Sequence, residues 1–123
     1  MQFPVFPEFK EIQPIDLALE YRENTWVLQI HGPIELTNVG NFFERASEML
    51  GNKDKIVLDM AGVRYIDSIG MGTLLDLNSR FRRNGCSVRL IAVPSRIAQV
   101  FRLCGVTRML DCYETLESAT ANW

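Results

Sequence analysis

Apolar and polar side chains alternate over residues 15–22, which predicts a β-strand with one buried face. A second, mostly apolar stretch follows at residues 25–31, and the turn-forming pair Glu23-Asn24 lies between the two. Two strands joined by so short a turn form an antiparallel hairpin. The regular structure therefore opens with a β-hairpin, which Gly32-Pro33 ends.

Helical spacing begins after the hairpin, because apolar residues recur every three or four positions over residues 38–50. Thr37 is the expected N-cap of this helix, and Gly51 is expected to end it. Residues 55–60 are almost continuously apolar, which is typical of a parallel strand covered on both faces. The same reasoning predicts helices at residues 69–84, 95–104 and 114–120 and strands at residues 87–93 and 108–112.

The predicted order is β-β-α-β-α-β-α-β-α, and strands that alternate with helices form a mostly parallel sheet. We therefore predict a single α/β domain at residues 15–123, entered by the antiparallel hairpin. Residues 1–14 form an irregular arm outside it, because three prolines interrupt any regular element. The arm also carries three phenylalanines, which could pack against the domain or against a second copy in a homodimer: Phe3, Phe6 and Phe9.

Charge and composition narrow the classes of function. The net charge is −2, so broad binding to nucleic-acid phosphates is not expected. The basic cluster Arg80, Arg82 and Arg83 falls late in a predicted helix, where cations suit the helix dipole. No apolar run approaches the roughly 18 residues of a membrane span, and residues 1–14 do not have the pattern of a signal peptide. We expect a cytoplasmic protein that does not insert into membranes.

Three cysteines are present, an odd number with no CxxC spacing, which disfavours a disulfide framework or a zinc site. We expect Cys86, Cys104 and Cys112 to be reduced and buried as small hydrophobic side chains.

Ser68 lies where a predicted strand passes into a helix, as the nucleophile of many serine hydrolases does. That motif requires glycine two residues before the serine, and Ile66 occupies the position here. The single histidine, His31, is expected to be exposed near the end of a strand, so Ser68 has no evident general base. We expect no catalytic residue, and a serine hydrolase is the least favoured hypothesis.

Metal and cofactor sites are not expected either. Asp59, Asp67 and Asp76 are spread over a strand, a loop and a helix. No GxxxxGK[ST] phosphate-binding motif occurs, and Gly70-Met71-Gly72 lacks the rest of a dinucleotide fingerprint.

Two interpretations of Ser68 remain open. The hydroxyl could simply cap the helix that follows. It could also accept a phosphate, because free N–H groups and the dipole at a helix start favour negative charge. Gly70 and Gly72 would then leave room for a docking partner, and Met71 would offer it an adaptable apolar contact.

Several motifs in this chain resemble those of bacterial anti-sigma factor antagonists, which are STAS domain proteins. The segment Asp67 to Gly72 is similar to the D-S-[ST]-G-[LI]-G signature of that family. Three further segments resemble its G-x-[IL]-D, V-[IL]-[DN]-[LM] and V-[FL]-x-[LM]-[ST]-G-[LV] motifs, in the family's order: residues 32–35, 57–60 and 100–106. The resemblance spans roughly residues 15–120.

This resemblance implies a phosphorylation-switched binding protein that is not an enzyme. The unphosphorylated form would bind an anti-sigma factor, itself a serine kinase of the GHKL type, and so release a sigma factor. The kinase would phosphorylate Ser68, and a PPM-type phosphatase would reset it. The residues implied to contact the partner around Ser68 are Glu35, Asp67, Ile69, Gly70, Met71 and Gly72.

Two departures from the family pattern matter. Ile69 replaces a serine or threonine, which leaves Ser68 as the target hydroxyl, and Glu35 replaces an aspartate. The alternative is a STAS scaffold without a switch, a subunit of a lipid-transport ABC complex or of a stress-sensing assembly.

Overall fold

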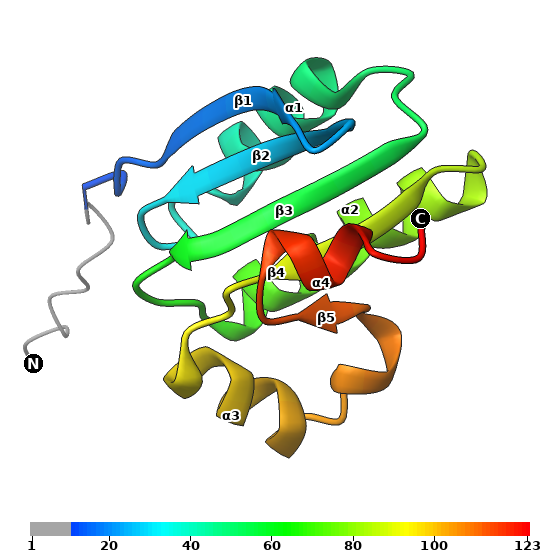
Figure 1. The fold of residues 1–123 in the computed structure, drawn as a ribbon. Coiled ribbons are helices and arrows are strands. Elements are labelled where there is room, and N and C mark those ends of the chain that lie inside the picture. Colours follow the sequence, from blue (N-terminus) through cyan, green and yellow to red (C-terminus); the bar gives the residue numbers. More distant parts are fainter. Residues whose placement is uncertain (1–10) are drawn as a thin grey trace, which may run out of the picture.

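A computed structural model describes residues 11–123 of the chain (Figure 1). The predicted packing of Phe3, Phe6 and Phe9 lies outside these residues. The elements, in chain order, are β1 (Asp16–Arg22), β2 (Thr25–His31), α1 (Val39–Leu50), β3 (Lys55–Gly62), α2 (Ser68–Arg83), β4 (Ser87–Ile91), α3 (Ser95–Leu103), a 3₁₀ turn η1 (Thr107–Met109), β5 (Cys112–Tyr113) and α4 (Leu116–Thr120).

The five strands form one sheet in the order β1-β2-β3-β4-β5. β1 and β2 pair antiparallel, from Asp16 opposite His31 to Arg22 opposite Thr25, and all later neighbours pair in parallel. Glu23 and Asn24 both adopt positive φ, as the central residues of a tight hairpin turn often do. The predicted α/β domain with a hairpin entrance is confirmed.

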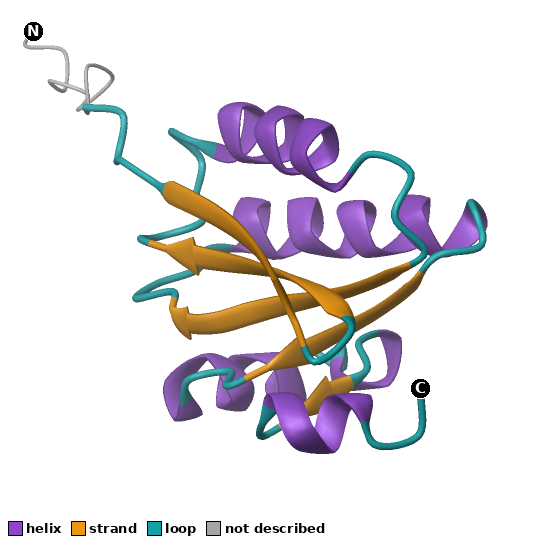
Figure 2. Cartoon of the chain, turned by 45° about the horizontal axis from the view of Figure 1, so that its top comes forward, coloured by secondary structure: helices purple, strands orange, loops and turns teal. Residues whose placement is uncertain are grey.

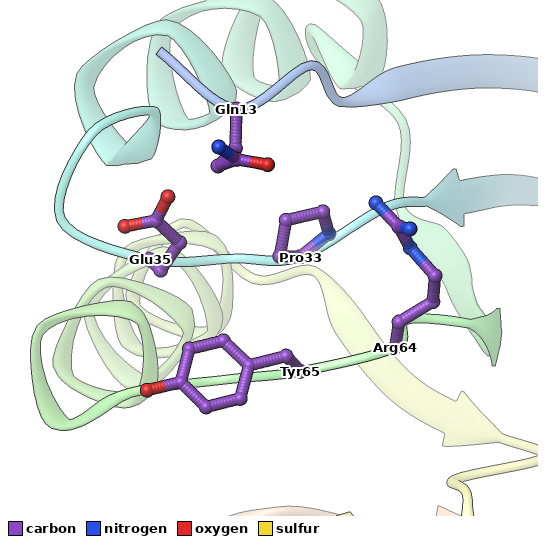
Figure 3. A pocket seen from close by; sticks show the side chains of 5 residues that line it. All are labelled: Gln13, Pro33, Glu35, Arg64 and Tyr65. Carbon is purple, nitrogen blue, oxygen red and sulfur yellow. The ribbon is translucent and has the colours of Figure 1, made fainter. Parts of the chain in front are cut away.

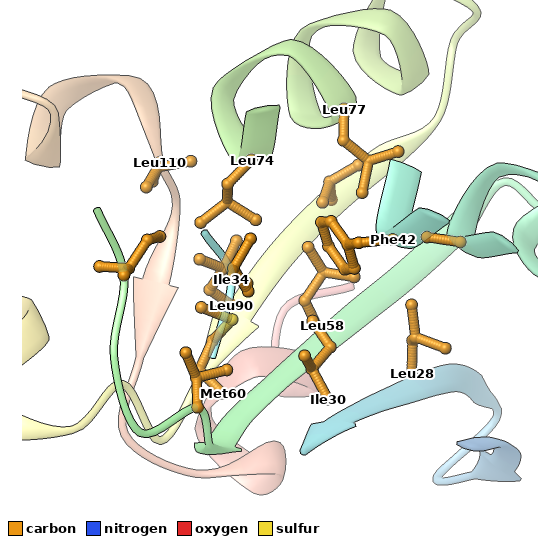
Figure 4. Close-up of a cluster of buried hydrophobic side chains, with 14 of the residues drawn as sticks. Leu28, Ile30, Ile34, Phe42, Leu58, Met60, Leu74, Leu77, Leu90 and Leu110 are labelled. Carbon is orange, nitrogen blue, oxygen red and sulfur yellow. The ribbon is translucent and has the colours of Figure 1, made fainter. Parts of the chain in front are cut away.

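Both faces of the sheet are covered, as the continuous apolar run in β3 predicted (Figure 2). Side chains of β2 and β3 alternate between the two faces. On the larger side, Leu28, Leu58 and Leu90 pack with Phe42 of α1 and Leu74 of α2 (Figure 4). On the smaller side, Val27, Val57 and Ile91 pack with two residues of α4, Leu116 and Ala119. α1 and α2 therefore lie on one face of the sheet and α4 on the other.

The C-terminal part differs from the prediction in one element. Residues 108–112 were expected to form a strand, but residues 107–109 make the 3₁₀ turn η1 and only Cys112 and Tyr113 pair with β4. Val106 and Leu110 are both buried, and the three residues between them are all exposed, so burial does not alternate there as it does along a half-buried strand. The N–H of Met109 donates to the carbonyl of Val106 at 2.9 Å, which closes a helical turn in place of the start of the expected strand.

The expectation for the cysteines is correct only in part. Cys86 is buried, whereas Cys104 and Cys112 are exposed, and all three are free thiols. Cys104 is the C-cap residue of α3 and lies beyond the buried stripe formed by Ile97 and Phe101.

None of the helices within residues 11–123 combines the length and the apolar character needed to cross a membrane.

Candidate functional site

Two loops lie side by side at the carboxyl ends of β2 and β3: the first loop is residues 32–38, and the second loop is residues 63–67. The N–H of Gly32 donates to the carbonyl of Gly62 at 2.9 Å, and the N–H of Ile34 donates to that of Tyr65 at 2.9 Å. Ile34 and Ile66 form an isolated parallel bridge, so the loops continue the sheet by a few residues. The second loop leads directly into α2. The hydrogen bonds to the first loop therefore fix where α2 begins.

Asp67 is the N-cap of α2, and Ser68 is the first residue of the helix. One carboxylate oxygen of Asp67 accepts from the N–H of Gly70 at 2.6 Å, and the other accepts from the N–H of Leu36 at 3.0 Å. Of the two open interpretations of Ser68, the one in which its hydroxyl caps the helix is therefore wrong. Aspartate and serine are about equally good caps, and Asp67 also fastens α2 to the neighbouring loop.

Ser68 is exposed at the start of α2. Its hydroxyl makes no hydrogen bond to any residue in the described range 11–123. The N–H groups of the first helical turn have no partner inside the helix, and Asp67 satisfies the one at Gly70. The N–H groups of Ser68 and Ile69 are left near the Ser68 hydroxyl. The positive end of the helix dipole lies at the same place.

The two glycines of the signature have different surroundings. A Cβ atom added to Gly70 would lie 2.0 Å from the carbonyl oxygen of Ile34 and 3.1 Å from the side chain of Ile66. A Cβ atom added to Gly72 would meet nothing within 4 Å. Gly70 therefore permits close packing of α2 on the first loop, and only Gly72 leaves open space on the outside.

The other predicted contact residues also divide between the interior and the surface. Ile69 is 48% exposed and Asp67 is half-buried. Met71 is 7% exposed and belongs to the main hydrophobic core. Glu35 is 2% exposed, and its carboxylate accepts hydrogen bonds from the N–H and the hydroxyl of Thr37.

Thr37 was predicted to cap α1, but Asn38 occupies the N-cap position. The buried amide of Asn38 accepts from the N–H of Glu35 and donates to the carbonyl oxygens of Pro33 and Gln13. Thr37 instead accepts from the N–H of Gln13 at 2.9 Å. The first loop is thus held in place by hydrogen bonds within the loop and by hydrogen bonds to Gln13.

Sequence reasoning missed two surface residues beside Ser68. Leu36 is 66% exposed and bonded through its N–H to the Asp67 cap, and Tyr65 is 55% exposed in the second loop. Leu36 directly follows the motif at residues 32–35, and Tyr65 lies two residues before the motif at residues 67–72. Each is a large, largely apolar residue in a loop, which is the signal that could have found it. We call Leu36, Tyr65, Ser68, Ile69 and Gly72 the Ser68 surface.

An open pocket of about 380 Å³ adjoins the Ser68 surface (Figure 3). Gln13, Pro33, Glu35, Arg64 and Tyr65 line it, so it is formed by both loops and the segment before β1. Within residues 11–123, no group of three or more His, Cys, Asp or Glu side chains is arranged to hold a metal ion. His31 is exposed, as predicted, at the end of β2.

Comparison with known proteins agrees with this architecture. The STAS domain family matches residues 16–119. Among solved structures, a putative anti-sigma factor antagonist from Thermotoga maritima is 19% identical with a TM-score of 0.75, over 85% of this chain and 92% of that one. An anti-sigma factor antagonist from Mycobacterium paratuberculosis is 16% identical with a TM-score of 0.76, over 88% of this chain and 92% of that one.

A murine anion transporter, Solute Carrier 26 family member A9, contains the same fold as one part of a longer chain. It is 14% identical with a TM-score of 0.75, over 94% of this chain and 23% of the transporter. At such identities the likeness concerns the fold. The family match over most of the chain, together with the sheet order and the hairpin entrance, shows that this protein belongs to the STAS domain family.

Proposed function

We propose that this protein is an anti-sigma factor antagonist switched by phosphorylation of Ser68. Unphosphorylated, it binds an anti-sigma factor that is also a GHKL-type serine kinase, and so releases a sigma factor. Phosphorylation ejects it from the kinase, and a PPM-type phosphatase restores the binding form. The binding domain is residues 15–123, residues 1–14 are an arm outside it, and the exchange takes place in the cytoplasm.

The observation that carries the proposal is the state of the Ser68 hydroxyl. It is exposed, and Asp67 rather than Ser68 performs the capping that the helix start requires. The hydroxyl can therefore be modified without removing a bond that the fold uses. The exposed apolar side chains of Leu36, Tyr65 and Ile69 belong to the same surface. Such a group of apolar side chains is typical of a surface that binds another protein.

The local charges also suit a phosphate. The free N–H groups and the dipole at the start of α2 favour a dianion at Ser68. The neighbouring carboxylate of Asp67 already accepts two backbone N–H donors, which spread its charge toward the protein and limit its repulsion of a phosphate. Phosphorylation is then expected to change the surface and to leave the fold in place.

The predicted contact residues take two roles in this proposal. Ile69, Gly72 and the exposed edge of Asp67 contact the kinase directly, together with Leu36 and Tyr65. Gly70, Met71 and Glu35 are buried, so we assign them the task of holding the two loops and α2 in register. A catalytic group is not needed in this chain, because ATP and its magnesium ion belong to the kinase.

The test is incubation of the protein with its cognate kinase and ATP, followed by mass mapping of the product. We expect one added phosphate, on Ser68, and none on the Ser68→Ala variant, which should still bind the kinase. A phosphate on another residue, or no phosphate with a kinase that is active on other substrates, contradicts the proposal.

A second candidate is a STAS module without a switch, held permanently in a larger assembly such as a lipid-transport ABC complex or a stress-sensing complex. The presence of this fold as one part of a murine anion transporter favours keeping this candidate. It predicts a stable complex whose affinity does not change in the Ser68→Asp variant, whereas the switch predicts a large loss.

A further inference from the structure

Charge is unevenly distributed along this chain. Residues 77–110 contain no aspartate or glutamate, and seven of the ten arginines fall within them. Since the net charge of the whole chain is −2, the remaining residues together carry −9. The arginines of this segment are Arg80, Arg82, Arg83, Arg89, Arg96, Arg102 and Arg108.

The fold gathers part of this charge at one edge of the molecule. In a parallel β-α-β unit the helix runs back against the strands, so the C-terminal ends of α2 and α3 both lie at the amino-terminal edge of the sheet. η1, which connects α3 to β5, lies at the same edge (Figure 1). Two hollows, of about 230 and 360 Å³, lie at η1, and Arg108 lines both of them.

Arg82 lines the first of these hollows and Arg102 the second. Two large apolar side chains are exposed among these arginines: Leu103, which is 80% exposed, and Met109, which is 59% exposed. We call Arg82, Arg102, Leu103, Arg108 and Met109 the arginine surface.

The charges of the arginine surface are largely uncompensated. Within residues 11–123, no carboxylate lies within ion-pair distance of Arg102 or Arg108. Arg82 is 3.9 Å from a carboxylate oxygen of Asp111, and that same oxygen is closer to Arg89, at 3.3 Å. Helix dipoles account for a cation at the end of α2 and of α3. They do not account for Arg108 in η1 or for the exposure of Leu103 and Met109.

We propose that the arginine surface is a second docking site, which binds an acidic segment of a partner protein carrying apolar side chains between its carboxylates. Guanidinium groups bind carboxylates in a bidentate manner, and the cluster consists of arginine alone, without lysine. Leu103 and Met109 fit the apolar residues of such a segment. A long polyanion is less suited, because the net charge of the rest of the chain repels it.

This site is separate from the Ser68 surface. Ser68 begins α2 and Arg82 lies in its last turn, so the two residues are separated by most of this helix, about 21 Å along its axis. The inference does not depend on the proposed switch, because phosphorylation at one end of α2 leaves the arginine surface unchanged. A partner bound there can therefore stay bound in both states of Ser68.

The test uses the full chain and a fluorescein-labelled peptide of repeated Glu-Glu-Leu-Asp units, with binding followed by fluorescence anisotropy. We expect binding that weakens as NaCl is raised from about 50 to about 300 mM. The double variant Arg102→Glu with Arg108→Glu should lose at least about tenfold in affinity. The same peptide with glutamine and asparagine in place of the acids should not bind.

The matched control is Arg22→Glu with Arg96→Glu, which changes the net charge equally at two exposed positions away from the arginine surface. It should bind the peptide within about twofold of the wild type, and circular dichroism should show both variants folded. Absence of peptide binding, or equal losses in the two double variants, overturns the proposal. Tighter binding to an oligo(dT) strand or to phosphatidylserine vesicles than to the peptide overturns it as well.

Discussion

On the inner side of the first turn of α2, Gly70 lies against the carbonyl of Ile34 and Met71 is packed in the core. On the outer side of the same turn, Ser68, Ile69 and Gly72 face solvent. One short signature thus serves two purposes, because the residues of one helical turn point in different directions around the helix axis, some toward the core and some toward solvent. The inner residues hold α2 against the loop after β2, and the outer residues are available to a partner.

The difference is sharpest between the two glycines, so Gly70→Ala is expected to have the largest effect on stability. The new methyl group meets backbone, which cannot move aside as a flexible side chain can. We expect a loss of at least about 2 kcal/mol in the free energy of unfolding. Gly72→Ala should instead stabilise α2 by up to about 1 kcal/mol, because its methyl group is unobstructed.

Urea denaturation of the two alanine variants measures this contrast. Equal changes in the midpoint for Gly70→Ala and Gly72→Ala would contradict the division between an inner and an outer side.

Asp67→Ala is expected to have the next largest effect. It removes both the N-cap bond to Gly70 and the bond to Leu36 that ties α2 to the first loop. We expect a loss of about 1–2 kcal/mol by urea denaturation. Asp76→Ala, at an exposed position later in α2 whose ion pair with Arg80 is open to solvent, should change stability by less than about 0.5 kcal/mol. A similar loss in both variants would argue against the bridging role of Asp67.

The outer side is tested by Leu36→Ala, which should leave stability nearly unchanged and weaken binding to the cognate kinase. A loss of roughly tenfold is typical when an exposed apolar anchor is truncated at an interface. Leu103→Ala is the matched control, because Leu103 is also exposed but lies on the arginine surface. Isothermal titration calorimetry measures the affinity of the kinase for each variant. An equal loss of affinity in Leu103→Ala and Leu36→Ala would contradict binding of the kinase at the Ser68 surface.

The last effect is confined to alkaline pH and concerns a buried group outside the site. Burial, with a contribution from the charge of Asp54, raises the pKa of the Cys86 thiol from 9.0 to about 11. The unfolded chain then releases this proton at lower pH than the folded protein, so stability should fall as the pH rises from 9 toward 11. Comparing urea midpoints of the wild type and Cys86→Ala across this range isolates the effect; identical slopes would contradict it.

Most of the fold could be predicted from the sequence, because period and burial agree in each long element. Alternation in β1 and helical spacing in α1 and α2 each indicate one type of element, and the apolar run in β3 is short and contains β-branched residues, which favours a strand over a helix. The strand predicted at residues 108–112 was wrong because so short a segment offers too few positions to tell alternation from helical spacing. Contacts with the rest of the domain bury Val106 and Leu110 and leave the three residues between them exposed.

The site was harder to predict, since its division into inner and outer residues depends on contacts across the chain. Asp67 and Ser68 are adjacent and are comparable caps, so local sequence cannot choose between them. The choice follows from the N–H of Leu36, which only the second oxygen of a carboxylate can satisfy alongside the cap. The roles of Gly70 and Gly72 likewise depend on where the loop after β2 passes, which no local pattern encodes.

In the proposed switch, the outer side of the first turn of α2 forms the docking site, and the fold does not depend on it. The most direct measurement is the affinity of the cognate kinase for Ser68→Asp, with Ser79→Asp as the control at an exposed serine about three turns further along α2. We expect at least about tenfold weaker binding for Ser68→Asp, with a melting temperature within about 2 °C of the wild type, and wild-type binding for Ser79→Asp. Wild-type affinity in Ser68→Asp, or a loss of affinity that accompanies unfolding, would contradict it.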